Sequence, residues 1–301
     1  MDKIYHFLKY RFIAIGITVG LIIVFSTIAV MKGGHILGID FVGGIKIIAK
    51  FETGINESKI REGLAHFDPT VQQIGKIERN EYIISTKISG KDADSKKDFE
   101  ELKKSISEKF KNVQILNEEN VGPAIGDFLK KSAVKLFLIA NLLMGIYLAF
   151  RFELKYAVGA MVALYHDLIL TVAFCAVAEV ELNIPVIAAL LTIFGYSVND
   201  TIIIFDRIRE NVKNQAKESI IEVIDKSVSQ TLSRTILTVL TTLFSVLSLY
   251  FLGGKVVNDF AVVLLFGITT GIFSSIYIAS PVVVMWENLQ IKRKMKKTQH
   301  A

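Results

Sequence analysis

Long apolar runs constrain this chain more than any other feature. A helix needs about 20 apolar residues to cross the hydrocarbon core of a bilayer, because it rises only about 1.5 Å per residue. Six runs meet or approach this length, at residues 12–31, 133–150, 156–178, 184–205, 235–252 and 260–286. The sixth is longer than one bilayer thickness and must tilt or leave the membrane. We therefore predict a membrane all-α bundle of six helices.

Composition agrees with a membrane protein. Hydrophobic residues make up 51% of the 301 residues, and the mean hydropathy is +0.46, which is too apolar for an ordinary soluble domain. The first run follows Lys9 and Arg11, as in a signal peptide, but its length suits a span and no small-residue cleavage motif follows it. We expect a retained anchor in the lipid bilayer.

Basic residues give the orientation. Lys and Arg gather in the loops on one side of the six spans, which the positive-inside rule assigns to the cytoplasm. Both termini then lie in the cytoplasm. We attribute the net charge of +6 to the orientation of the spans in the membrane. No basic stripe with interleaved aromatic residues indicates a nucleic-acid partner.

A polar insert of about 80 residues separates the first two runs, near the lower size for an independent core. Its periodicity predicts strands at 45–51, 71–77, 82–88 and 113–116 and helices at 56–67 and 94–110. This order is the ferredoxin-like α+β arrangement, with both helices expected on one face of the sheet. The predicted organisation is N-terminus and first span at 1–34, extracytoplasmic domain at 35–128, five-span remainder of the bundle at 129–290 and basic cytoplasmic tail at 291–301.

The fourth run carries a carboxylate, Asp200, within apolar sequence and next to Asn199. An Asp at mid-span costs about 2.5–3.5 kcal/mol on insertion scales, so it is a functional candidate by default. Low dielectric favours its neutral form and a nearby guanidinium favours its charged form, and this competition allows uptake and release of a proton. The alternative is a neutral, hydrogen-bonded residue that joins two helices.

Polar residues of the fifth run share one helix face. Arg234, Thr238, Thr241, Ser245 and Ser248 recur every three or four residues. The hydroxyl residues can serve an ion path or close helix packing. Arg234 either points along this face toward a carboxylate or snorkels to the interface. We predict an ion relay of Asp200, Asn199 and Arg234, with the arginine as fixed counter-charge because it does not deprotonate.

Two other polar sites in the spans are interpreted either as parts of the relay or as structural groups. His166 and Asp167, in the third run, are either a second relay step or a structural pair inside the bundle. Asp206, at the end of the fourth run, fits a charged helix end with local ion pairs better than a relay. In the sixth run, a close-packing stripe without a chemical role is formed by residues spaced four apart, Gly267, Gly271 and Ser275.

Motifs for other chemistries are absent from the sequence. There is no Walker A sequence, no HExxH motif and no cysteine cluster, and the single Cys175 lies in an apolar run. We expect no cofactor, no metal and no enzymatic activity. Energy would have to come from an ion gradient, which supplies about 2.3 kcal/mol per elementary charge per 100 mV.

Several motifs together resemble the SecD/SecF family of protein-export membrane subunits. The first is GIDFVGG at 38–44, which contains Asp40, Phe41, Gly43 and Gly44. The others are NVGPAIG at 120–126, FRFE at 150–153, GYSVNDT at 195–201, FDRIREN at 205–211 and SRT at 233–235. The resemblance covers residues 5–286, and the single insert with Asn199 and Asp200 resembles the SecF branch.

This resemblance implies an RND-type half-unit that pairs with SecD in the bacterial cytoplasmic (inner) membrane. It also implies association with the SecYEG translocon, with YajC and YidC as further candidate partners, and action on emerging preproteins driven by a proton or sodium gradient. Asp200 and Arg234 match the family's intramembrane Asp and Arg. Gly43 and Gly44 would let the backbone turn from the first span into the first strand. A non-transporting scaffold and a half-unit of a small-molecule exporter remain as alternatives.

Overall fold

A computed structural model of the chain describes residues 4–31, 36–74, 80–86, 92–214 and 218–299. The chain forms two compact units. We call Leu37–Leu136 together with Leu182–Ile184 the sheet unit. The bundle unit comprises Met1–Ile36, Phe137–Glu181 and Pro185–Ala301.

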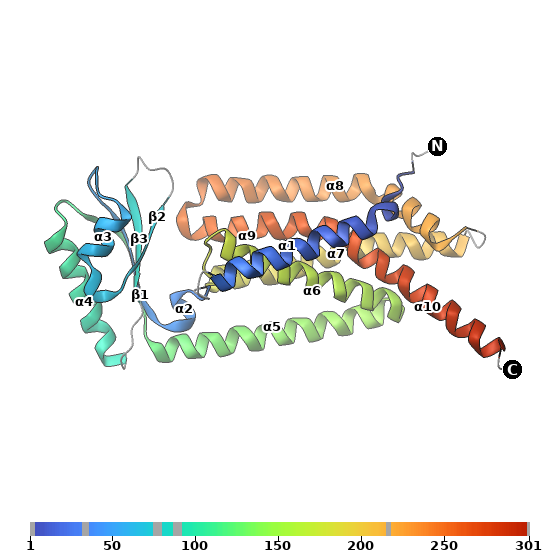
Figure 1. Ribbon diagram of the computed structural model, residues 1–301, viewed down its shortest axis with the longest axis horizontal. Helices are drawn as coiled ribbons and strands as arrows, with labels where there is room; N and C mark the ends of the chain where they lie inside the picture. Colours follow the sequence, from blue (N-terminus) through green and yellow to red (C-terminus); the bar gives the residue numbers. More distant parts are fainter. Residues whose placement is uncertain (1–3, 32–35, 75–79, 87–91, 215–217, 300–301) are drawn as a thin grey trace. The chain divides into compact units, whose positions relative to one another are not determined.

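Six helices are long and apolar enough to cross a membrane, which confirms the six-helix prediction. Their labels in Figure 1 are α1 (Arg11–Met31, after the 3-10 turn Phe7–Tyr10), α5 (Pro123–Arg151), α6 (Leu154–Val177), α7 (Ile184–Asn214), α8 (Ile220–Leu252) and α9 (Gly254–Ser274). The sixth span continues from α9 through a π-helical turn at Ser275–Ala279 into α10 (Ser280–Gln299). It runs over 39 residues, Val257–Met295, and so exceeds one bilayer thickness as expected.

Several helices begin well before the apolar runs do. The predicted starts were 133 and 235, whereas α5 begins at Pro123 and α8 at Ile220. Ser219 caps α8, because its Oγ accepts from the Glu222 amide while the Glu222 carboxylate accepts from the Ser219 amide. Hydropathy detects only the apolar part of a helix. It therefore misses the polar first turns of α8, which follow the capping box at Ser219.

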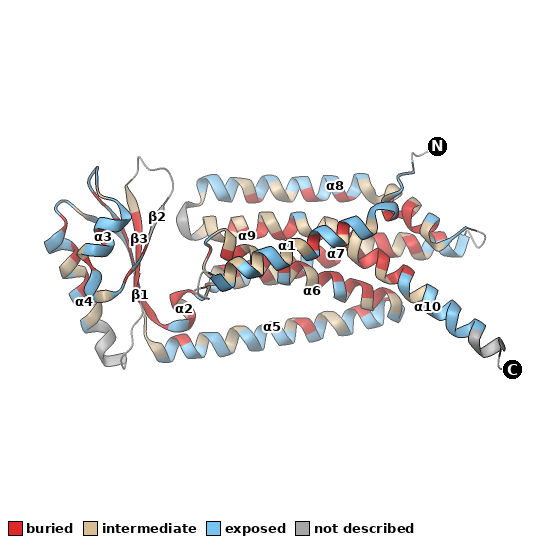
Figure 2. Ribbon diagram, viewed as in Figure 1, coloured by how far each residue is buried: buried red, intermediate tan, exposed pale blue. Residues whose placement is uncertain are grey.

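The helices differ in how far their apolar windows are buried. About half of each window is buried in α6, α7 and the sixth span, against 11% in α1, 6% in α5 and 17% in α8. Figure 2 shows long exposed faces on α5 and α8. The central residues, which include Tyr156, Phe205, Leu164 and Val283, form one hydrophobic cluster. Uncovered faces on the outer helices are expected where lipid or a partner protein surrounds a bundle.

The sheet unit contains four antiparallel strands in the order β2-β3-β1-β4. Its elements are α2 (Ile39–Val42), β1 (Gly44–Lys50), α3 (Glu57–Gly63), β2 (Thr70–Ile74), β3 (Glu81–Thr86), α4 (Asp92–Lys109) and β4 (Gln114–Val121). The predicted ends of two strands, at 75–77 and 87–88, lie outside the described residues.

The first helix of the insert is shorter than predicted. α3 ends at Gly63, and a separate 3-10 turn covers Ala65–Phe67. A Cβ at Gly63 would lie 2.6 Å from the ring of Phe110, so the close approach of that ring depends on a glycine here. The apolar spacing of 56–67 did not reveal this break.

One hydrophobic core holds the sheet unit together. It joins Ile45 and Ile47 of β1 to Ile60 of α3 and to Leu102 and Ile106 of α4, so both helices cover the same face of the sheet. Fully burying one such side chain contributes about 1.5–3 kcal/mol. At the edge, Lys103 of α4 lies 2.6 Å from Glu118 of β4, and this hydrogen bond raises the pKa of the lysine above its ordinary value.

Candidate functional site

Asp200 lies in the second half of α7 and is only 5% exposed. Buried Ile204 and Phe205 follow it one turn later, and Ile193 and Phe194 precede it. Its carboxylate forms no hydrogen bond or ion pair with any residue that the structure describes. An enclosed carboxyl without a fixed partner can change its protonation without breaking a built network.

Asp167, in α6, is the opposite case. It is completely buried, and its Oδ2 accepts hydrogen bonds of 2.6 Å from both Ser197 of α7 and Ser274 of α9. Such short distances are typical of hydroxyls that donate to a charged carboxylate. Asp167 therefore ties three helices of the bundle together.

His166 completes this cluster. Its Nδ1 lies within hydrogen-bond distance of Asp167 Oδ1, at 3.0 Å. The His166 side chain is 9% exposed, and its Nε2 is buried without a hydrogen-bond partner in the described part of the chain. These contacts favour the structural interpretation of the pair.

Close packing brings α7 and α9 together beside this cluster. A Cβ at Gly267 would lie 2.1 Å from Ile193 Cδ1, and one at Gly271 would lie 3.4 Å from Ser197. One turn further along, the hydroxyls of Thr201 and Ser275 are hydrogen-bonded at 2.8 Å. The π-helical turn begins at Ser275, and such turns occur frequently at functional sites.

Arg234 does not reach Asp200. It is exposed on α8 and forms no ion pair within the described residues. Thr238 and Thr241 are exposed on the same face, and their hydroxyls donate to the backbone carbonyls of Arg234 and Thr238. We call Arg234, Thr238, Thr241, Ser245 and Ser248 the polar face of α8, and all five residues are exposed.

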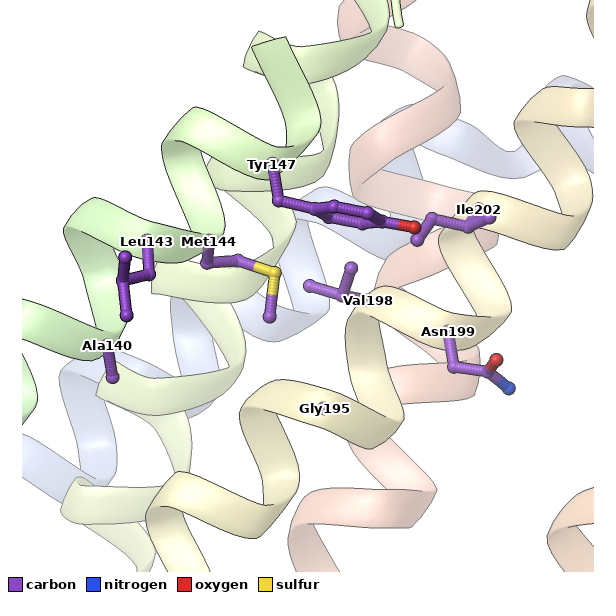
Figure 3. A pocket seen from close by; sticks show the side chains of 8 residues that line it. All are labelled: Ala140, Leu143, Met144, Tyr147, Gly195, Val198, Asn199 and Ile202. Carbon is purple, nitrogen blue, oxygen red and sulfur yellow. The ribbon is translucent and has the colours of Figure 1, made fainter. Parts of the chain in front are cut away.

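Asn199 borders a pocket of about 380 Å³ between α5 and α7. Figure 3 shows its amide directed away from the α5 side chains, whereas Tyr147 and Met144 reach across toward α7. The wall is otherwise apolar, formed by Ala140, Leu143, Met144, Gly195, Val198 and Ile202. Asn199 is thus adjacent to Asp200 in sequence but directed to a different, exposed side of α7.

Asp206 is part of an ion-pair network. Its carboxylate lies 2.5 Å from Arg151 Nη2 at the end of α5 and 3.7 Å from Arg209. The neighbouring Arg207 donates from Nε to Gln230 of α8 at 2.7 Å. These contacts join α5, α7 and α8 at one end of the bundle and favour the structural interpretation of Asp206.

Sequence analysis missed three groups. Ser197 and Ser274 looked like ordinary small residues, and only the packing of three helices reveals that they serve Asp167. Asp225 lay in a presumed loop; it is 3% exposed in α8, and its Oδ1 accepts from the Leu8 amide at 3.0 Å. A capping signal at Ser219 would have placed Asp225 in a helix.

The GIDFVGG motif forms a tight joint in the sheet unit. Asp40 accepts a hydrogen bond of 2.9 Å from the Ile184 amide at the start of α7. Gly43 ends α2 with φ +76°, a conformation that favours glycine. A Cβ at Gly44 would lie 2.6 Å from the carbonyl oxygen of Thr86, so β1 and β3 approach closely here.

Among the described residues, no group of three or more His, Cys, Asp or Glu side chains is arranged to hold a metal ion. The candidate site consists of Asp200 without a partner, the hydrogen-bonded Asp167 cluster and the exposed polar face of α8. Of the predicted relay, Asp200 and Asn199 are adjacent on α7, and Arg234 is separate on α8.

Comparison with known proteins gives this arrangement a family. The model that describes the C-terminal part of the protein-export membrane proteins SecD and SecF matches residues 101–289, well over half of the chain. The chain belongs to the SecD/SecF family.

Curated relatives extend the SecD/SecF match to nearly the whole chain. Protein translocase subunit SecF of Calditerrivibrio nitroreducens is 42% identical over 90% of each chain. The SecF subunit of Endomicrobium trichonymphae is 38% identical over 95% of this chain and 91% of its own. The similarity therefore includes the sheet unit and all six spans.

A solved SecD/SecF structure shares the fold. The crystal structure of SecDF from Thermus thermophilus, described as a translocon-associated membrane protein, superposes with a TM-score of 0.85 at 34% identity. The match covers 95% of this chain but only 39% of the SecDF chain. This chain thus spans about two fifths of that protein's length.

Proposed function

We propose that this chain is a SecF-type subunit that pairs with SecD and uses a proton or sodium gradient to promote preprotein translocation. The observation that carries the proposal is Asp200, an enclosed carboxylate without a fixed partner in a membrane-spanning helix. In the SecD/SecF family an ion must be taken up and released at membrane depth for such a gradient to be used. Asp200 is a buried carboxylate without a hydrogen-bond partner among the described residues, which suits this role.

The gradient provides enough energy for this role. One elementary charge that crosses the potential releases about 2.3 kcal/mol per 100 mV, which is comparable to the insertion cost of one intramembrane carboxylate. Ion uptake at Asp200 therefore changes the energy of the bundle by an amount large enough to bias two conformations. No enzymatic step is needed.

The polar face of α8 supports a partner in the membrane. A guanidinium and four hydroxyl side chains are exposed along this face, and polar groups are costly where a span faces lipid. SecD would cover this face and bring Arg234 into a shared relay with Asp200. The SecDF chain is more than twice as long as its matched region, which agrees with a second half of this kind.

We infer that the sheet unit is an extracytoplasmic, ferredoxin-like domain. Its strand order β2-β3-β1-β4, with both helices on one face, supports this assignment. The start of α1 and the end of α10 lie at the same end of the bundle unit (Figure 1), which supports two cytoplasmic termini in the bacterial inner membrane. The domain divisions at 34, 128 and 290 remain part of this proposal.

Further partners follow from the same role. SecYEG would be the translocon that the pair assists, YajC and YidC would be accessory proteins, and the extracytoplasmic domain would contact the emerging preprotein or the SecD outer domain. Engineered cysteines in residues 45–118 should crosslink to one of these two. The absence of both crosslinks would contradict the proposed contact.

The decisive experiment measures preprotein export in inner-membrane vesicles with the gradient intact or collapsed. Asp200→Asn removes the ionisable group with little change in size, so the gradient-dependent share of export should disappear. Asp127→Asn, an exposed carboxylate at the start of α5, is the matched control and should leave that share unchanged.

The same measurement distinguishes the proposed relay from the two alternative functions. If the chain is a scaffold, export by the Asp200→Asn variant should equal that of the unmodified protein, provided that SecD and SecYEG still co-purify. That result would refute the relay. A half-unit of a small-molecule exporter would instead leave preprotein export independent of the chain.

A further inference from the structure

The helix α10 continues beyond the apolar part of the sixth span. No charged residue occurs from 260 to 286, and Glu287 is the first to follow. Its Oε1 lies 2.5 Å from Nζ of Lys155, which immediately precedes the apolar run at 156–178. Because each of the two residues borders an apolar run, their ion pair marks the level at which the spans leave the hydrocarbon core.

The part of α10 after Glu287 is exposed and basic. Side chains 288–295 are all exposed, as Figure 2 shows for this length of the helix. Three consecutive basic residues lie in it, Lys292, Arg293 and Lys294, and two further lysines follow them in the sequence. We call these three residues the basic end of α10. No Asp or Glu occurs from 288 to 301 to balance their charge.

Several basic side chains of the neighbouring helix ends are instead matched by carboxylates. Ion pairs join Arg151 to Asp206, Lys155 to Glu287, Arg207 to Glu210 and Lys226 to Glu218. Paired charges largely cancel each other's field at a distance, whereas a row of like charges on one helix adds up. The positive potential at this end of the bundle unit is therefore concentrated on α10, where it attracts an external anion.

Lipid headgroups lie within reach of the basic end of α10. The headgroup layer is about 5–8 Å thick on each side of a bilayer, and Lys292 follows Glu287 by five residues, about 8 Å along the helix axis. Helix side chains tilt toward the N-terminus, which in α10 is the direction of the membrane. Lys and Arg also extend their charged groups toward an interface on long apolar stems.

We propose that the basic end of α10 binds the phosphate headgroups of anionic phospholipids in the leaflet where the sixth span ends. Basic clusters directly after a span are typical of such binding, and Trp286 is of a type enriched at membrane interfaces. Nucleic acid fits less well, because 287–301 contains no Phe, Tyr or Trp on which a base could stack. That this is the cytoplasmic leaflet rests on the orientation in the proposed function.

The test measures which lipids gather at α10 of the full chain in nanodiscs of phosphatidylcholine. A fluorophore is attached to Gln290→Cys, an exposed position, after the buried Cys175 has been replaced by serine. Energy transfer is measured to a trace of chain-labelled phosphatidylglycerol or phosphatidylcholine. The anionic probe should be enriched about fivefold over the neutral one, the effect of about one basic residue at an anionic surface.

A variant in which Lys292, Arg293 and Lys294 are all replaced by Gln should lose at least about half of this enrichment, because the two later lysines remain. The matched control removes the same charge from exposed positions of the sheet unit, Lys50→Gln, Arg61→Gln and Lys111→Gln. It should keep the full enrichment. Raising the salt offers a second measurement if the α10 variant inserts poorly. The Debye length falls from about 8 Å at 0.15 M to about 3 Å at 1 M, so the enrichment should fall with it.

Equal enrichment in the α10 variant and the unmodified chain would overturn the inference, and so would an equal loss in the control or an enrichment that high salt leaves unchanged. Absence of lipid enrichment, together with binding of a single-stranded RNA that requires the basic end of α10, would overturn it in favour of nucleic acid.

The lipid measurement and the proposed function fail separately. Both leaflets of these nanodiscs have the same composition, so the result does not depend on the orientation of the spans or on Asp200. If enrichment is absent while Asp200→Asn abolishes gradient-dependent export in vesicles, only this inference fails. If enrichment requires the basic end of α10 while Asp200→Asn leaves gradient-dependent export unchanged, only the proposed function fails.

Discussion

Asp167 and Asp200 are both buried carboxylates within spans, yet their surroundings give them different tasks. Asp167 has hydrogen-bond partners in Ser197, Ser274 and His166, whereas Asp200 has none among the described residues. A saturated carboxylate holds helices in place because any change of charge would break three contacts. In the proposed function, the unpartnered one binds and releases an ion.

Asp167→Ala should destabilise the bundle by about 2 kcal/mol, since intramembrane hydrogen bonds average about 0.6 kcal/mol and three are lost. Thermal unfolding in detergent, with the midpoint compared with that of Ser197→Ala, measures this difference. Ser197→Ala removes one bond and should cost about a third as much.

The same variants also test the relay interpretation of Asp167. Asp167→Asn keeps an acceptor oxygen and should retain the gradient-dependent share of export in the vesicle assay. If Asp167→Asn loses gradient-dependent export while its stability is normal, Asp167 would have to be part of the relay.

At the scale of elements, small residues decide which helices come into contact. Gly267 and Gly271 let α9 lie against Ile193 and Ser197 of α7, close enough for the hydroxyl bond between Thr201 and Ser275. By contrast, Gly145 of α5 has no neighbour within 4 Å of a hypothetical Cβ. The same residue type is therefore essential in one helix and dispensable in another.

Gly267→Leu should lower the free energy of unfolding by about 1–3 kcal/mol, because the added side chain overpacks the contact with Ile193. Gly145→Leu is the matched control and should be neutral or slightly stabilising, since leucine is the better helix former. Unfolding midpoints of the two variants, measured in one detergent, check this. Equal midpoints would contradict the close α7–α9 contact.

At the scale of the whole molecule, the exposed polar face of α8 agrees with the proposed pairing with a second membrane protein. Its hydroxyls bond to their own backbone, so the guanidinium of Arg234 is the group that needs an outside partner. This agrees with a chain that matches two fifths of the SecDF structure.

Thr241→Trp should block pairing with SecD, because a bulky ring on the polar face prevents close helix approach. Co-purification of tagged SecD is expected to fall at least about tenfold, which corresponds to about 1.4 kcal/mol of affinity. Leu240→Trp is the control. It points about 100° away around the helix and should leave pairing intact. Equal recovery of SecD with both variants would show that this face is not the interface.

The sequence by itself determined the six spans, the intramembrane Asp200 and the family, because hydropathy, an isolated charge and contiguous motifs are local properties. It also predicted the polar face of α8 from spacing alone. It did not reveal that this face is exposed, that Ser197 and Ser274 saturate Asp167, or that Asp40 caps α7. Each of these depends on which helices pack together and in which rotation, and residues as far apart as 40 and 184 acquire a common role only once the chain has folded.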